Sequence, residues 1–136
     1  MFAEYQIMQT NQFQYIKEEN SEWLKTLELM NQECIQMKTR LSRLLENNSS
    51  NEVVDCAEQF QNQILLKEEA IELMKHDLRD QDLLLNKDYF RPYQQISDTT
   101  LEKQEQIRKQ LGYLENDFML MHETFNDYIS RNMIQP

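Results

Sequence analysis

The side chains best suited to chemistry lie close together in the sequence: Glu72, His76, Asp77 and Asp80. Glu72 and His76 are four residues apart, as are His76 and Asp80, so a helix would place them along one face. Carboxylates beside an imidazole can hold a divalent cation or respond to pH near neutrality. The same spacing is typical of a solvated charged face with ordinary pairs between turns. Glu72, His76 and Asp80 are therefore candidate metal ligands and not an assigned site.

Motifs of other catalytic and cofactor-binding sites are missing from the sequence. The Glu-x-x-His motif of di-iron bundles needs a glutamate three residues before a histidine. Those positions hold Leu73 before His76 and Met119 before His122. There is no Cys-x-x-Cys, and a single glycine excludes a phosphate-binding glycine loop. We therefore expect a protein that is not an enzyme and needs no cofactor.

The element that must position these side chains is a long helix with apolar residues at alternating spacings of three and four. Its seam is Phe13, Ile16, Asn20, Trp23, Leu27, Met30, Cys34, Met37, Leu41 and Leu44. Nine of these ten residues are apolar, and no Gly or Pro interrupts them. A 4-3 repeat places one line of side chains against a partner helix. The pattern predicts a helix over residues 13–46.

Two further segments carry the same repeat. One seam is Val53, Ala57, Phe60, Ile64, Lys67, Ile71, Met74, Leu78, Gln81 and Leu85; the other is Ile107, Leu111, Leu114, Phe118, Met121, Phe125 and Tyr128. They predict helices over 51–86 and 99–131. Ser49 with Glu52, and Thr99 with Glu102, have capping-box spacing; Asp98 is the alternative cap for the third helix. Pro92 breaks the helical pattern between them.

These elements predict an all-α fold, an antiparallel up-down-up bundle of three long helices with coiled-coil-like packing. The polar break at residues 47–50 is short enough to force antiparallel neighbours. The 136 residues suit a single bundle domain over residues 13–132. For residues 1–12, a flexible segment and a short helical segment are both consistent with the sequence.

Aligning the predicted helices by residue count places three amides of the seams at one level: Asn20, Gln81 and Gln104. A buried amide layer would fix the register of the helices at some cost in stability. The alternative is that this end of the bundle is hydrated and loosely packed.

Some apolar side chains lie outside the seams. Leu66 and Leu73 are one heptad apart with Ala70 near them, which indicates a second apolar stripe. Such a stripe is typical of self-association or of docking by another protein. Aromatic side chains near Pro92 form another candidate partner contact, or they fold back over the bundle: Tyr89, Phe90 and Tyr93.

The formal charge of −10 argues against binding to nucleic acid or to an anionic membrane surface, because both attract clustered Lys and Arg. The opening MFAEYQIMQT has no signal-peptide pattern, and no stretch is apolar enough to span a bilayer. We therefore expect a cytoplasmic protein. Hairpin geometry would keep Cys34 and Cys56 too far apart for a disulfide, so we expect both to be small buried groups.

At NSEWLKTL, AEQFQNQ and LMKHDL the chain resembles a family of small, uncharacterised bacterial helical proteins with no assigned activity. The resemblance covers the first two predicted helices, and the third matches only in pattern. Members of that family often carry a histidine about one turn before the tryptophan, and another after the glutamate of the second motif. Glu19 or Asn20, and Gln59, occupy those places here. The resemblance therefore implies no metal site.

The sequence favours a non-enzymatic protein–protein interaction or scaffold module that self-associates as a homodimer. The alternative is a bundle that binds a metal or small ligand at the Glu72, His76 and Asp80 face.

Overall fold

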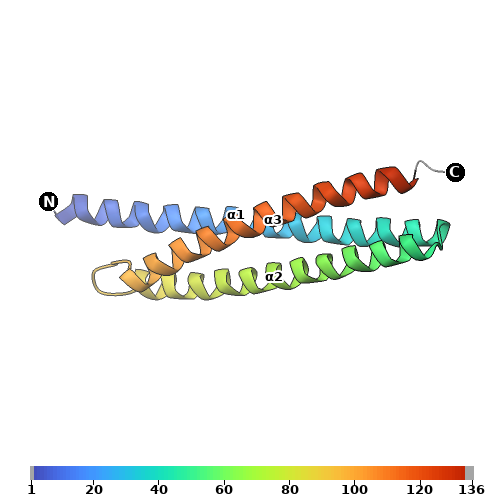
Figure 1. The fold of residues 1–136 in the computed structure, drawn as a ribbon. Helices are drawn as coiled ribbons and strands as arrows, with labels where there is room; N and C mark the ends of the chain where they lie inside the picture. The colour runs from blue at the N-terminus through green and yellow to red at the C-terminus, as the bar shows by residue number, and fades with distance from the viewer. Residues whose placement is uncertain (1, 134–136) are drawn as a thin grey trace. The chain divides into compact units, whose positions relative to one another are not determined.

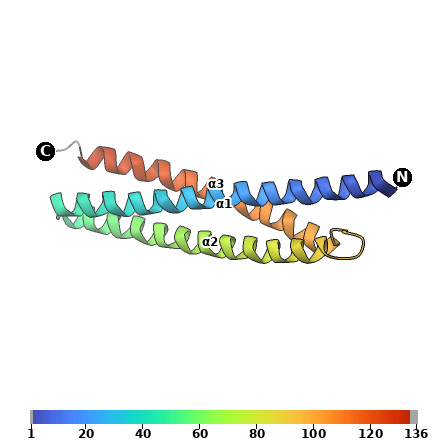
Figure 2. The same cartoon turned by 180° about the vertical axis from the view of Figure 1, so that it is seen from behind.

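The computed structural model describes residues 2–133, and the side chains of residues 11–132. It contains α1 (Phe2–Asn47), α2 (Asn51–Tyr89) and α3 (Asp98–Met133), with no strand in that range (Figure 1). Figure 2 shows the two connections, a short turn after α1 and a longer loop between α2 and α3. The predicted all-α antiparallel three-helix bundle is confirmed.

The ends of the helices differ slightly from the predicted ends. α1 starts at Phe2, so the main chain of residues 2–12 is helical, whereas Met1 and the side chains of residues 1–10 lie outside the described part. α2 runs to Tyr89, beyond the predicted end at 86. α3 starts at Asp98 and runs to Met133.

The chain forms two compact units, and every helix contributes to both. Unit 1 contains residues 1–27 and 73–112, which include the loop between α2 and α3. Unit 2 contains residues 28–72 and 113–136, which include the turn between α1 and α2. In each unit, segments of all three helices supply the buried side chains.

The three predicted seams form the cores of these units. Their apolar members are buried apart from Trp23 and Tyr128, and Lys67 is half-buried as well. Lys67 packs its aliphatic stem at the seam, a common arrangement for long cationic side chains. Near the C-terminus of α3 the seam takes a step of four residues, so Ile129 is buried and Tyr128 only half-buried. The Tyr128 hydroxyl instead donates to the Val53 carbonyl at 3.3 Å.

The helix caps lie beside the predicted capping residues. At the start of α2 the Ser50 hydroxyl, not that of Ser49, accepts the Val53 N–H at 3.3 Å. At the start of α3 the Ser97 hydroxyl accepts the Thr100 N–H at 3.2 Å. Each serine satisfies an N–H of the first helical turn that has no partner inside the helix.

Candidate functional site

The three seam amides come together in unit 1, where each is at most 4% exposed. The Gln81 side-chain amide donates to Gln104 Oε1 at 3.0 Å and to the Thr100 carbonyl at 2.7 Å. The Gln104 amide donates to Asn20 Oδ1 at 2.8 Å and to Glu19 Oε1 at 2.9 Å. Asn20, Gln81 and Gln104 thus form a buried layer that links all three helices. Asn20 Nδ2 and Gln81 Oε1 are left without partners among the described residues.

An ion pair extends this layer towards solvent. The guanidinium of Arg108 on α3 binds Glu19 on α1, with contacts of 2.6 and 3.3 Å, and it also contacts Glu105. The hydrogen bond from Glu19 raises the pKa of Arg108 above its ordinary value. The guanidinium lies 5.7 Å from the centre of the Trp23 ring, which is a cation–π distance. Trp23, half-buried at the seam, is therefore covered by a charged group.

A second polar cluster anchors the loop between α2 and α3. The Asp88 carboxylate is 2% exposed, and one of its oxygens accepts from the Ser97 N–H, the Ser97 hydroxyl and the Thr100 hydroxyl at 2.6–3.0 Å. Burial alone would raise the pKa of Asp88, but the hydrogen bonds from Thr100 and Ser97, with the nearby Arg91, hold it below its ordinary value. The charge is therefore retained for structure, and it ties the end of α2 to the start of α3.

The candidate metal ligands do not gather into a metal site. His76 Nδ1 lies 3.3 Å from Asp80, and both side chains are well exposed. Among the residues that the structure describes, no group of three or more His, Cys, Asp or Glu side chains could hold a metal ion. The pair is thus an exposed contact between successive helical turns, which typically contributes little to stability.

The second histidine belongs to a polar chain between α1 and α3 in unit 2. His122 Nε2 lies 3.1 Å from Glu33, and Nδ1 lies 3.4 Å from the Asn126 amide. Asn126 in turn accepts from Arg40 at 2.7 Å, and the Arg40 guanidinium lies over the Phe125 ring. These side chains are occupied by one another. Sequence spacing alone did not indicate this cluster, because its members come from two helices.

Neither cysteine forms a disulfide. Cys34 is fully buried, and burial raises the pKa of its thiol to about 11. Cys56 is only half-buried, in contrast to the expected burial. A thiol that is protonated and shielded from solvent is a poor nucleophile, so Cys34 acts as a small packing group.

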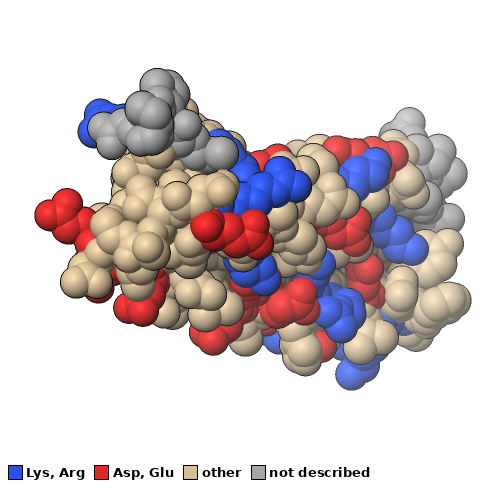
Figure 3. Space-filling model, turned by 90° about the vertical axis from the view of Figure 1, so that its right-hand side faces the viewer, with Lys and Arg blue, Asp and Glu red and all other residues tan. Residues whose placement is uncertain are grey.

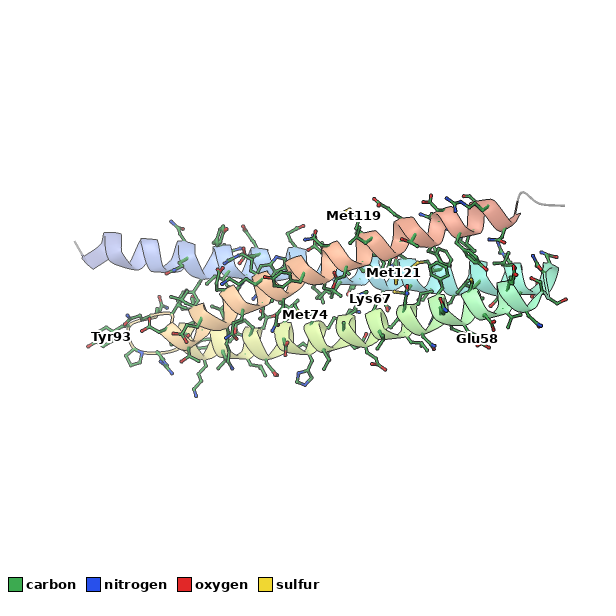
Figure 4. All side chains as sticks on the ribbon, viewed as in Figure 1. Glu58, Lys67, Met74, Tyr93, Met119 and Met121 are labelled. Carbon is green, nitrogen blue, oxygen red and sulfur yellow. The ribbon has the colours of Figure 1, made fainter. Side chains whose placement is uncertain are left out.

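The candidate partner-binding residues are largely on the surface. Leu66 and Leu73 are 64% and 69% exposed, whereas Ala70 between them is half-buried. In the loop region Phe90 and Tyr93 are exposed, and Figure 4 shows Tyr93 pointing away from the helices. Tyr89 is half-buried because its ring packs edge-on against Phe13, 5.4 Å between centroids. It supports the core of unit 1 in addition to any contact with a partner.

Leu66 also lines a surface groove that the sequence did not reveal, which we name the α2–α3 groove. Its walls in unit 2 are Gln63, Leu66, Lys67, Asp117, Leu120, Met121 and Thr124, and its volume is about 370 Å³. Lys67 and Met121 lie on the facing sides of the two helices, whereas Met119 points away from α2 (Figure 4). Leu120 is 64% exposed. The groove therefore exposes a leucine from each of two helices.

The molecular surface carries both signs of charge. On the face drawn in Figure 3, acidic and basic side chains are interspersed, with uncharged surface between them. No described helix is long and apolar enough to cross a membrane.

The chain matches no protein-family model, and comparison with curated proteins and with solved structures gave no match either. The resemblance to small bacterial helical proteins stays a prediction from the quoted motifs.

Proposed function

We propose that this protein is a non-enzymatic interaction module that self-associates as a homodimer through the α2–α3 groove. The observation that supports this proposal is the exposure of Leu66 and Leu120, 64% each, on the two walls of one groove. Full burial of a leucine side chain contributes about 1.5–3 kcal/mol. Apolar residues gathered at a groove are typical of protein contact surfaces.

The charges of the groove suit a second copy of the same chain. Lys67 lines the groove from α2 and Asp117 lines it from α3. In a two-fold symmetric dimer the same surface meets itself, so Lys67 of each copy can pair with Asp117 of the other. Exposed ion pairs contribute about 0–1 kcal/mol. The leucines would therefore supply most of the affinity, and the ion pairs would select the orientation.

The formal charge of −10 favours a protein partner over nucleic acid or an anionic membrane. The absence of catalysis is part of the proposal, and the occupied side chains support it. Asp88 is held by three hydrogen bonds, and His122 contacts Glu33 and Asn126. These groups stabilise contacts between helices and have no open position for a substrate.

Sedimentation equilibrium over a range of protein concentrations tests the dimer. We expect the wild-type chain to dimerise and the double variant Leu66→Gln/Leu120→Gln to weaken dimerisation at least a hundredfold, about 2.7 kcal/mol. Leu83→Gln is the matched control, because Leu83 is 69% exposed on α2 but does not line the groove. A wild-type monomer at the highest concentration, or equal dimerisation of wild type and double variant, would refute the proposal.

A further inference from the structure

Unit 1 contains another surface groove, between α1 and α2, which we name the α1–α2 groove. Its volume is about 310 Å³. Lys17, Asn20 and Leu24 are on its α1 wall, and Leu78, Arg79 and Asp82 are on its α2 wall. These residues follow the three- and four-residue spacings that place side chains on one helix face. The groove is therefore a regular feature of two packed helices.

Positive charge distinguishes this groove from the two others. Lys17, Lys75 and Arg79 line it with Asp82 as the single carboxylate. The α2–α3 groove has one lysine and one aspartate, and a third groove places Lys103 beside Asp77 and Asp80. The excess of cations occurs in a chain with 24 acidic and 14 basic residues. Local charge of this sign attracts anions.

Two of the cations have no carboxylate partner. Neither Lys17 nor Arg79 forms a salt bridge with a residue that the structure describes. The nearest aromatic contact of Lys17 is weak, since its ammonium lies 5.9 Å from the centre of the Tyr89 ring. The two groups come from facing helices, so both can donate to one bound anion.

The buried amide of Asn20 adds a further donor. Asn20 is 4% exposed and lines the groove, and its Oδ1 is occupied by the Gln104 amide. Its Nδ2 has no partner in the described part of the chain. A buried donor without an acceptor is costly. An acceptor atom in the groove would relieve that cost.

The walls also include apolar side chains. Leu24 is 39% exposed, and Leu78 is buried beneath the groove wall at 4%. Lys17 and Leu24 are two helical turns apart, about 10 Å along α1 at 1.5 Å per residue. A ligand with a charged head and an apolar tail would thus reach both kinds of side chain. Small-ligand sites commonly combine apolar walls with a few polar groups that fix orientation.

We propose that the α1–α2 groove binds a small aliphatic carboxylate, with its carboxylate at Lys17, Arg79 and the Asn20 amide. A chain of about eight carbons matches the distance between the cations and Leu24. The single negative charge suits the site better than the double charge of phosphate, because Asp82 also lines the groove. Binding here is independent of the dimer surface, which lies in unit 2.

Titration of the ¹⁵N-labelled full chain with octanoate, followed by NMR at constant pH and ionic strength, tests the proposal. We expect saturable shifts of the Lys17 and Arg79 backbone signals and of the Asn20 side-chain amide. Octanol, which lacks the charge, and inorganic phosphate, which lacks the chain, should each bind at least tenfold more weakly. If phosphate binds as tightly as octanoate, the proposed ligand class is wrong.

Variants test the cations. Lys17→Gln/Arg79→Gln should weaken octanoate binding at least tenfold, whereas Arg79→Lys should retain most of it. Lys103→Gln, in the third groove, is the matched control and should bind like wild type. Both altered positions are exposed, and circular dichroism checks that the helices persist. Non-saturable shifts, unmoved Asn20 signals or equal binding by the double variant would each overturn the proposal. An Asn20 amide that bonds Gln81 Oε1 and ignores octanoate would do so as well.

Discussion

Asp88 shows how a single carboxylate can be committed to structure. It accepts three hydrogen bonds from Ser97 and Thr100 while almost fully buried. Leaving buried donors without an acceptor costs more than the bond itself contributes. The cluster is therefore stable only while the acceptor is an ionised carboxylate.

Asp88→Asn should lower the free energy of unfolding by about 2–3 kcal/mol at neutral pH, because bonds to a charged acceptor are lost. Urea denaturation measures this difference. Asp127→Asn, at an exposed position on α3, is the control and should change stability little.

The same variant has a pH signature. Because the folded pKa of Asp88 is lowered, its contribution is present above the unfolded value and is lost as pH falls through the folded value. The difference between wild type and Asp88→Asn should thus narrow towards about pH 3. A difference that stays constant or widens at acid pH would contradict the assignment.

The sequence contained a partial signal for this cluster. Asp88 follows Leu85 by three residues, and Thr100 precedes Gln104 by four, so both extend the predicted seams. A carboxylate at a seam position indicates a buried acceptor that needs donors. The donors could not be predicted, because Ser97 reaches Asp88 only through the path of the loop.

At the scale of the elements, apolar periodicity located all three helices but not their ends. Burial against neighbouring helices depends on spacing, which the sequence states directly. Helix ends depend on which hydroxyl reaches a free N–H, a choice between adjacent residues. Ser49 and Ser50 are equally good caps by composition, and only the structure shows that Ser50 contacts Val53.

These caps can be compared directly. Ser50→Ala should destabilise the protein by about 1 kcal/mol, the typical cost of losing an N-cap. Ser49→Ala is the matched control, one residue away with no cap contact printed in the first turn of α2, and should be nearly neutral. Thermal denaturation of the two variants provides the measurement, and a larger loss for Ser49→Ala would show that the cap is assigned to the wrong residue.

The candidate sites depended on contacts between helices, and residue counting succeeded only where the helices are regular. It placed Asn20, Gln81 and Gln104 at one level because short connections fix the offset between neighbours. It did not reveal the two grooves or the cluster around His122. Those depend on how far neighbouring side chains extend, which periodicity does not describe.

At the scale of the whole molecule, the charge of −10 opposes the proposed association of two copies. Exposed pairs such as Lys67 with Asp117 are individually weak and are screened by salt. The repulsion between two acidic chains involves many more charges. Its screening should therefore outweigh the loss of the ion pairs.

Raising the salt concentration should accordingly strengthen dimerisation. Sedimentation equilibrium at low and high sodium chloride measures the change in dissociation constant. Lys67→Gln is the informative comparison, because it removes the pair and should leave the direction of the salt effect unchanged. Weaker dimerisation in high salt would mean that the ion pairs dominate the interface.

The amide layer of unit 1 has a consequence for redesign of this chain. Gln81 reaches the α3 backbone and Gln104 reaches α1, so each helix is matched to the others at one level. Lengthening a single helix on one side of that level would bring an aliphatic neighbour opposite an amide. The layer thus works as a ruler: heptads can be added safely only to all three rods together.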